Sequence, residues 1–271
     1  MCERPAIRHV ERVMGTVFSF DIRVPGQDGA APAAHAPAVT AALERATGWL
    51  HHVDAVFSTY RPGSQISRLA RGEITVAGCD PEVAEVLDRC ETMAAATAGR
   101  FSVAPRGRLD PSGLVKGWAI ERASALLTEA GLPDHHINGG GDVQLCGGPA
   151  PGEPWRVGLA DPLEPGELIT VVSGRDLAVA TSGTAERGRH IIDARTGRAA
   201  TALASITLVG RHLTDVDALA TAAFVMGADA RAWAEAWPGI EALAVTRDHS
   251  AWRTSGFERF TTRDGLDLLP G

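Results

Sequence analysis

The chain has 271 residues and a formal net charge of −7 at pH 7, with 26 Lys and Arg against 33 Asp and Glu. Its hydrophobic share of 45% is ordinary for a globular protein, so a sizeable core can form. No basic cluster is visible, which argues against binding to nucleic acid or to an anionic membrane surface. No apolar run approaches the ~20 residues of a membrane span. Because the N-terminus also lacks the apolar segment of a secretory signal, we expect a cytoplasmic protein, unless a longer natural chain carries a leader.

Hydrophobic periodicity in the N-terminal half predicts one strand and three helices. Residues 13–24 alternate between apolar and polar side chains, which predicts a half-buried strand. The Pro-, Ala- and Gly-rich residues 25–37 predict a mobile loop. Helices are expected at about 38–58, from the Asp80-Pro81 start to Gly99, and at about 115–130.

The C-terminal half mixes short strands with two further helices. Helices are predicted near 216–227 and 229–236. Strands are predicted near 142–146, 155–160, 168–173, 177–181, 190–193, 203–210 and 241–247. The elements follow no regular βαβ rhythm, which favours an α+β fold over a doubly wound sheet. No internal repeat is visible, and we expect one domain over residues 1–271.

The most informative motif is the small-residue segment 214–224. Asp217 and Thr221 are four residues apart, so a carboxylate and a hydroxyl would lie on one face of a helix. Such hard oxygen ligands suit Mg²⁺ holding a phosphate-bearing substrate. The alternative is a capping box, in which Thr214 caps the helix and Asp217 returns the hydrogen bond.

Residues 109–118 are predicted to be a turn that runs into a helix. A helix N-terminus offers free N–H groups and partial positive charge to a phosphate. Gly113 and Gly117 would let a ligand approach the backbone, and Lys116 would neutralise a phosphate oxygen or pair with a carboxylate. The alternative is a capped helix start with a solvated lysine, and the segment is not a Walker A loop.

Three consecutive glycines mark the segment 137–143. Such a run predicts either a tight turn between strands or a close approach of a ligand to the backbone. It is not a dinucleotide-binding fingerprint, because G-x-G-x-x-G is absent and no helix follows.

Two further segments carry candidate functional side chains. In residues 187–197, His190 is a candidate general base with arginines nearby for phosphate, or this segment is a surface hairpin with its turn at 193–197. Tyr60, the only tyrosine, lies in a predicted loop and could stack on a flat heterocycle or be a partly buried aromatic. His51 and His52 are interpreted as partly exposed helix residues rather than ligands, because no second ligand stands at metal spacing.

Taken in order along the chain, these motifs resemble the ApbE family, the FAD:protein FMN transferases. The matching segments are Met14-Gly15-Thr16, 58–69, 110–117, 138–143, 180–183, 190–197 and 217–221. The resemblance implies the mixed α/β architecture of that family, with largely antiparallel sheets and flanking helices.

The resemblance also implies an activity and a site. Such enzymes bind FAD with Mg²⁺ at its pyrophosphate, and a Ser or Thr hydroxyl of an acceptor protein attacks the FMN phosphorus while AMP leaves. The family pattern implies that Asp217 and Thr221 ligate Mg²⁺ through their side chains, and Gly113 through its carbonyl. The same pattern makes His190 the favoured base. It implies FAD contacts at Met14, Tyr60, Phe101, Ser102, Val103, Asp110, Lys116, Asp142, Ser182 and His190.

Two other functions compete with the transferase. The first is a Mg²⁺-dependent FAD pyrophosphatase that gives FMN and AMP, with water replacing the acceptor hydroxyl. The second is a non-catalytic FAD-binding protein, which needs neither a metal nor a base. The Asp217 and Thr221 pair together with His190 favours a catalytic protein, and we expect the transferase.

Overall fold

A computed structural model describes residues 5–24, 36–184, 188 and 191–261 of the chain. Its strands are β1 (Ala6–Val13), β2 (Thr16–Arg23), β3 (His135–Gly139), β4 (Asp142–Cys146), β5 (Trp155–Ala160), β6 (Leu168–Gly174), β7 (Ala178–Gly183), β8 (Ile192–Asp193), β9 (Arg198–Ala199), β10 (Leu203–Gly210), β11 (Glu241–Thr246) and β12 (Ala251–Arg253). Its α-helices are α1 (Ala36–Phe57), α2 (Gln65–Ala70), α3 (Pro81–Ala96), α4 (Ser112–Glu129), α5 (Leu213–Met226) and α6 (Ala230–Ala236). Short 3₁₀ turns are η2 (Val76–Gly78), η3 (Gly227–Asp229) and η4 (Phe257–Phe260).

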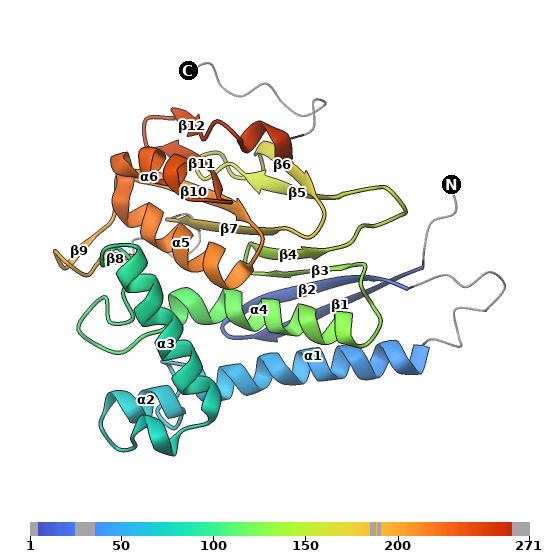
Figure 1. Cartoon of the computed structure of the whole chain (residues 1–271), viewed down its shortest axis with the longest axis horizontal. Helices are drawn as coiled ribbons and strands as arrows, with labels where there is room; N and C mark the ends of the chain where they lie inside the picture. The colour runs from blue at the N-terminus through green and yellow to red at the C-terminus, as the bar shows by residue number, and fades with distance from the viewer. Residues whose placement is uncertain (1–4, 25–35, 185–187, 189–190, 262–271) are drawn as a thin grey trace.

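The centre of the fold is an eight-stranded sheet with the order β1-β2-β3-β4-β7-β10-β11-β12 (Figure 1). Every neighbouring pair in this sheet is antiparallel. β5 and β6 form a separate hairpin, as do β8 and β9. This combination of helices with an antiparallel sheet confirms the predicted α+β class. The expectation of one domain over residues 1–271 stays a prediction.

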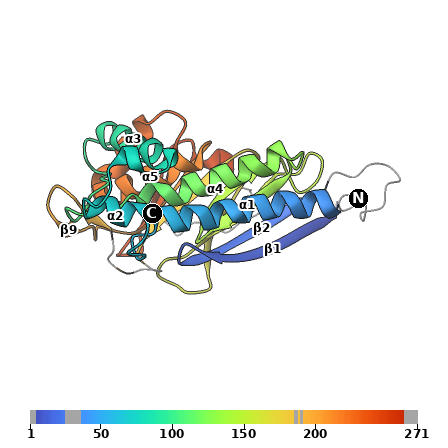
Figure 2. The same cartoon turned by 90° about the horizontal axis from the view of Figure 1, so that it is seen from below.

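Helices and hairpin cover opposite faces of the sheet. α1, α4 and α5 lie on one face, with α4 between the other two (Figure 2). On the other face, Leu159 and Val172 of the β5–β6 hairpin and Phe257 of η4 pack against the central strands at Val179 and Val209. Apolar side chains are thereby removed from water on both sides of the central strands, which is the main favourable contribution to folding.

α5 and β10 are the most completely buried elements. All eight residues of β10 are buried, as expected for a strand with both faces covered. Ala218, Ala220, Ala222 and Ala223 of α5 are all fully buried. Because these side chains are small, α5 can lie close to the sheet and to α4 at the same time.

The strand predicted at 13–24 is the second arm of a hairpin. Its inward residues Phe18, Phe20 and Ile22 are buried, as predicted. The prediction was wrong at its start, because Met14 and Gly15 form a turn with φ of 54° and 71°, and β1 precedes that turn. Alternation alone cannot place such a turn, since the left-handed conformation of Met14 is unusual for a residue with a side chain.

α2 and β3 are among the other elements that were not predicted. Residues 58–69 were expected to be a loop, but α2 begins within them, where Ser64 caps the helix by accepting a hydrogen bond from Ser67 N at 3.1 Å. β3 is short and rich in polar residues, and its pairing with β2 and β4 makes it a strand. The loop predicted over 25–37 falls mostly outside the described residues, and α1 begins at Ala36.

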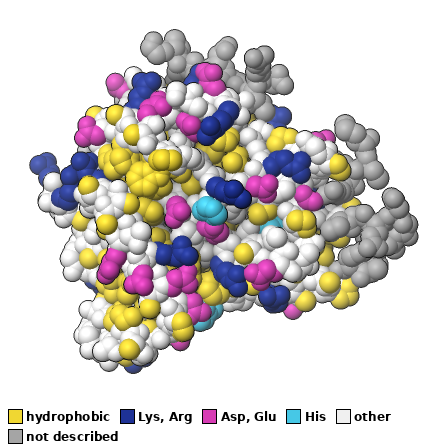
Figure 3. All heavy atoms as spheres, in the orientation of Figure 1, with side chains coloured by type: hydrophobic (Ala, Val, Ile, Leu, Met, Phe, Trp, Pro, Cys, Tyr) yellow, Lys and Arg dark blue, Asp and Glu magenta, His cyan; other side chains and the backbone are white. Residues whose placement is uncertain are grey.

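The surface agrees with the charge pattern of the sequence. On the face seen in Figure 3, basic and acidic side chains are intermingled and do not gather into a patch of one sign. Within the described ranges, no helix has both the length and the hydropathy needed to cross a membrane.

A buried histidine joins α4 to β3. His135 is fully buried, its Nδ1 lies 2.7 Å from Leu132 O, and its Nε2 lies 2.8 Å from Ser124 Oγ. The carbonyl can only accept, so Nδ1 carries the proton and the Ser124 hydroxyl donates to Nε2. Burial lowers the pKa of His135 from 6.5 to about 4, because the charged ring would lose its hydration.

We predict that His135 makes the fold sensitive to acid. Between pH 6.5 and about 4 the unfolded chain binds a proton on His135 that the folded chain does not, so the free energy of unfolding falls as the pH drops. The lowered pKa corresponds to a loss of about 3 kcal/mol over that range. Urea unfolding at pH 7 and pH 5 measures about 2 kcal/mol of this loss, because the rest falls below pH 5. His135→Gln should reduce the loss while lowering stability at pH 7.

The exposed His249 provides the matched control, as His249→Asn. His136, whose pKa is also lowered by burial, is present in all three proteins. The difference in acid-induced stability loss between the unsubstituted protein and His135→Gln therefore reports on His135. An acid loss as large in His135→Gln as in the unsubstituted protein would contradict the prediction.

Candidate active site

Three separate elements, α4, β4 and α5, bring charged side chains together at one place. Lys116 of α4 forms ion pairs with Asp142 of β4 and with Asp217 of α5, the latter at 3.2 Å between Nζ and Oδ2. The Asp142 and Asp217 side chains are 1% and 8% exposed, whereas Lys116 is 21% exposed. We call Lys116, Asp142 and Asp217 the ionic centre. Two buried carboxylates share one ammonium there, so the centre keeps a net negative charge and attracts a further cation.

Lys116 is the only lysine in the sequence, and every other basic side chain is an arginine. An ammonium is a compact charge on a flexible stem, whereas a guanidinium is a broad planar fork. The gap between the two carboxylates therefore holds a compact cation. This excludes the prediction of a fully solvated lysine at position 116.

The glycine run before Asp142 is a tight turn, one of the two predicted alternatives. Gly140 and Gly141 have φ of 59° and 90°, and Gly139 pairs with Asp142 across the hairpin. A Cβ at Gly139 would lie 2.6 Å from the Phe18 ring, so the close approach here is to the protein itself. Asp142 then accepts a hydrogen bond from Thr181 N at 3.0 Å, which fixes the carboxylate against β7.

Gly117 sets the separation of α4 and α5. Its N–H donates to Asp217 Oδ2 at 3.0 Å, and a Cβ at this position would lie 2.4 Å from Leu213 O. The prediction that Gly117 lets a ligand approach is therefore wrong, because the backbone of α5 fills that space. The glycine serves the site by letting the Asp217 carboxylate reach the backbone of α4.

Thr221 and Gly113 lie together one helical turn farther along. A Cβ at Gly113 would lie 3.6 Å from Thr221 Oγ1 and 3.3 Å from the ring of the buried Phe101. Asp217 and Thr221 thus face the same stretch of α4, as their spacing predicted. The alternative capping box is wrong, because α5 begins at Leu213 and Asp217 accepts its hydrogen bond from α4.

The loop before α4 places the other predicted contacts at the N-terminus of this helix. Asp110 N donates to Val103 O at 2.7 Å, and Asp110 Oδ1 accepts from Ser112 N at 3.1 Å. Ser102 and Val103 are half-buried. Asp110 thus caps the first N–H group of α4, since the N-cap residue Pro111 offers no side-chain acceptor, and the positive end of the helix dipole faces this loop.

A cavity of about 560 Å³ lies beside the β1–β2 turn. Met14, Thr16, His51 and Arg61 are among its lining residues. A Cβ at Gly140 would lie 2.8 Å from Thr16 Oγ1, so this turn adjoins the β3–β4 turn that leads to Asp142. The cavity and the ionic centre are therefore connected through two adjacent hairpin turns.

Tyr60 is 95% exposed and follows α1 in the loop before α2. The alternative of a partly buried aromatic is therefore wrong, and the ring is accessible to a ligand. Ser182 is buried on β7, next to the Thr181 that holds Asp142.

His190 lies outside the described residues, so its role stays a prediction. Its surroundings are partly described: β8 and β9 form a short hairpin, in which Gly197 N donates to Asp193 O at 2.8 Å. The predicted turn at 193–197 is therefore confirmed.

A second group of ligand-type side chains was missed by sequence spacing. His52 of α1 lies near Asp80 and Glu82 at the start of α3, with ligand atoms within 4.8 Å of one another. His52 is half-buried and pairs with Glu82 at 3.9 Å, while His51 is exposed and pairs with Glu11 at 3.2 Å. We assign no ligand to this group, because ion pairing within it accounts for its geometry.

Comparisons with known proteins agree with this arrangement. The ApbE family matches residues 14–107 and 102–244. A Treponema pallidum protein named FAD:protein FMN transferase is 30% identical over 259 residues, covering 85% of this chain and 71% of that protein. A Rhodobacter capsulatus protein of the same name is 36% identical over 165 residues, which are 55% of this chain and only 30% of that protein.

Solved structures show the same fold. The ApbE flavin transferase of Vibrio cholerae superposes with a TM-score of 0.79 at 22% identity, covering 94% of this chain and 100% of that structure. The ApbE protein of Thermotoga maritima superposes with a TM-score of 0.80 at 22% identity, covering 96% and 100%. The ionic centre is built from the motifs that the sequence analysis identified. Because the family match also extends over most of its length, the chain belongs to the ApbE family.

Proposed function

We propose that this chain is a Mg²⁺-dependent FAD:protein FMN transferase. It would move FMN from FAD to a Ser or Thr hydroxyl of an acceptor protein and release AMP. The observation that carries this proposal is the ionic centre, where two buried carboxylates hold the ammonium of Lys116 in the second turn of α4. The family, and the names of its members in Treponema pallidum and Rhodobacter capsulatus, support the same assignment.

The donor set near the ionic centre fits a magnesium ion. Asp217 offers a carboxylate, Thr221 a hydroxyl and Gly113 a carbonyl, which are the hard oxygen ligands that Mg²⁺ prefers. The two carboxylates of Asp142 and Asp217 already bind one cation, the Lys116 ammonium. When bound, the metal would neutralise negative charge on the pyrophosphate of FAD.

The chain's own groups would orient FAD and handle the proton. The first-turn N–H groups of α4 and the Lys116 ammonium would hold phosphate oxygens. Tyr60 would stack on a flat ring of FAD, and Met14 would line the adjoining cavity. His190 would take the proton from the acceptor hydroxyl as its oxygen bonds to the FMN phosphorus and the bond to AMP breaks.

The proposal predicts Mg²⁺-dependent release of AMP from FAD together with an acceptor peptide that is heavier by one FMN. High-performance chromatography for AMP and mass spectrometry of a Ser- or Thr-containing peptide measure both products. Asp217→Asn should lower the rate by at least ~100-fold, since it removes a metal ligand and several kcal/mol of charge stabilisation.

Asp215→Asn is the matched control for this change, because Asp215 is an exposed carboxylate two residues earlier on α5. Thermal unfolding of both variants checks that the fold is intact. AMP with free FMN and an unmodified peptide would favour the FAD pyrophosphatase. FAD that stays bound with no AMP would indicate a flavin-binding protein, and an unchanged rate in Asp217→Asn would remove Asp217 from the metal site.

We predict that Tyr60 contributes to FAD affinity and not to stability. Tyr60→Ala should weaken FAD binding by about tenfold, because an aromatic ring stacked on a heterocycle contributes about 1–3 kcal/mol. Tyr60→Phe keeps the ring and should bind like the unsubstituted protein. Fluorescence titration with FAD measures the affinity, and equal affinities for the two variants would argue against stacking.

We predict that His190→Ala lowers the transfer rate by ~100-fold while FAD binding is retained, as expected for loss of a general base. Single-turnover AMP release and FAD titration measure the two effects separately. His249→Ala, at an exposed histidine in the turn before β12, is the control. An unaffected rate in His190→Ala would exclude the role of base.

A further inference from the structure

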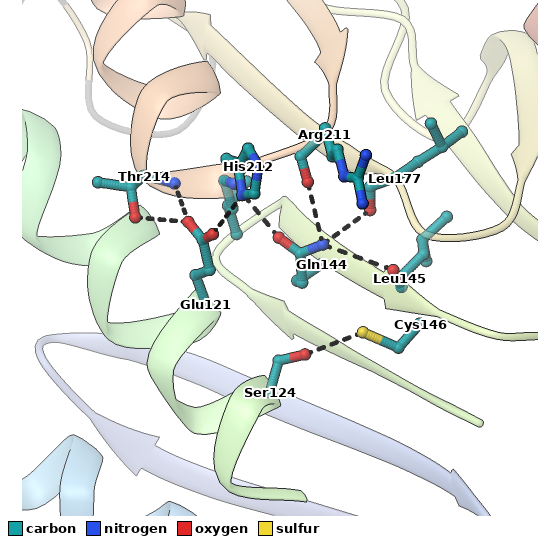
Figure 4. A network of polar contacts seen from close by, with 10 residues as sticks. Glu121, Ser124, Gln144, Leu145, Cys146, Leu177, Arg211, His212 and Thr214 are labelled. Atoms are coloured by element: carbon teal, nitrogen blue, oxygen red, sulfur yellow. Dashed lines mark hydrogen bonds and ion pairs between the residues drawn. The ribbon is translucent and has the colours of Figure 1, made fainter. Parts of the chain in front are cut away.

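The N-terminus of α5 is closed by side chains from two other elements (Figure 4). Glu121 of α4 accepts hydrogen bonds through Oε2 from Thr214 N at 2.9 Å and from the Thr214 hydroxyl at 2.5 Å. Gln144 of β4 accepts one through Oε1 from Leu213 N at 3.2 Å. The first N–H groups of a helix have no partner within the helix, and here they find partners across the tertiary fold.

The local residue that would normally supply the cap does not do so. His212 occupies the N-cap position, and no side chain forms a local cap hydrogen bond. The His212 ring instead turns to Glu121, with 2.8 Å between Nδ1 and Oε1 (Figure 4). Glu121 therefore replaces the local cap, and its negative charge lies at the positive end of the α5 dipole.

The orientation of the Gln144 amide is set by its surroundings. Its Nε2 lies 3.3 Å from Leu177 O, 3.5 Å from Leu145 O and 3.5 Å from Arg211 O. These three atoms are carbonyl oxygens, so the amide nitrogen must face them and Oε1 must face α5. Gln144 is buried, so this arrangement holds the first residue of α5 against the middle of β4.

The caps connect the same elements as the ionic centre. Glu121 follows Lys116 by five residues on α4, and Gln144 follows Asp142 by two residues on β4, on the same face of the strand. The capped residues precede Asp217 by four and three residues on α5. Each element that supplies a charge to the ionic centre therefore also takes part in closing the α5 N-terminus.

We propose that Glu121 and Gln144 are positioning residues that fix α5 along its axis and thereby set the place of Asp217 and Thr221 against Lys116 and Gly113. The part of this inference that concerns Mg²⁺ rests on the proposed function. Residues that orient metal ligands typically change metal affinity when they are removed, even though they do not touch the metal. A cap that merely stabilised the helix would lower the unfolding temperature and leave the ionic centre unchanged.

Two variants and one control separate these roles. Glu121→Ala removes a charged cap, and Gln144→Ala removes a neutral one, so any effect common to both comes from displacement of α5 and not from lost charge. Glu129→Ala removes an exposed carboxylate from the same helix, where it pairs with Arg122 at 2.9 Å. Glu121→Gln keeps the size of the side chain and an acceptor for Thr214 N, so it should leave α5 in place, and Gln144→Ala carries the test if Glu121→Ala does not fold.

The sole lysine supplies a readout that needs no ligand. Protein grown with ¹³C-labelled lysine gives the side-chain NMR signal of Lys116 alone, because no other lysine is present. In Glu121→Ala and Gln144→Ala we expect this signal to move toward its position in Asp217→Asn, and in Glu129→Ala to stay in place. An unmoved signal in both cap variants would overturn the positioning role, whatever happens to activity.

Binding of Mn²⁺ alone, measured by electron paramagnetic resonance, tests the link to the metal. We expect both cap variants to bind Mn²⁺ ~10-fold more weakly, which is the usual size of such effects. AMP release should recover at high Mg²⁺ concentration in these variants, because the chemistry itself is unchanged. If the lysine signal moves but Mn²⁺ affinity is equal in all proteins, including Asp217→Asn, the metal part of the proposed function fails and the positioning of Asp217 stands.

Discussion

The ion pairs of Lys116 with Asp142 and Asp217 are the interaction on which the rest of the arrangement depends. Two buried carboxylates would be strongly destabilising without a partner, since their charges lose their hydration. The Lys116 ammonium of α4 compensates the negative charge of one carboxylate on strand β4 and of another on helix α5. The sheet order, the two hairpin turns and the packing of α4 on α5 all bring these three side chains to one place.

Close helix packing makes this convergence feasible. Gly117 and the alanines of α5 allow two helix backbones to approach until a side-chain carboxylate on one bonds to an N–H of the other. The caps from Glu121 and Gln144 then hold α5 in place. The ligand-type oxygens of Asp217 and Thr221 are thus mounted on a helix that is fixed at its start and along its side, as a preorganised site requires.

The N-termini of α4 and α5, which both lie next to the site, differ in how their N–H groups are satisfied. The N-terminus of α5 is satisfied by side chains of α4 and β4, whereas that of α4 is capped locally, by Asp110 on Ser112 N. The cavity beside the β1–β2 turn is lined in part by Arg61, which directly follows the exposed Tyr60 in the chain.

Periodicity in the sequence by itself determined most helices and strands and the shared face of Asp217 and Thr221, because these depend on neighbouring residues, whereas the structure chose the tight turn for the glycine run before Asp142. The order of the motifs also pointed to the family. Only the tertiary structure decided that Gly117 serves helix packing, that Thr214 is bonded to Glu121, and that Lys116 joins two carboxylates. The physical reason is that these contacts join residues that lie from 26 to about 100 positions apart in the sequence. Local propensity carries no information about which distant backbone group or charge will lie beside a residue.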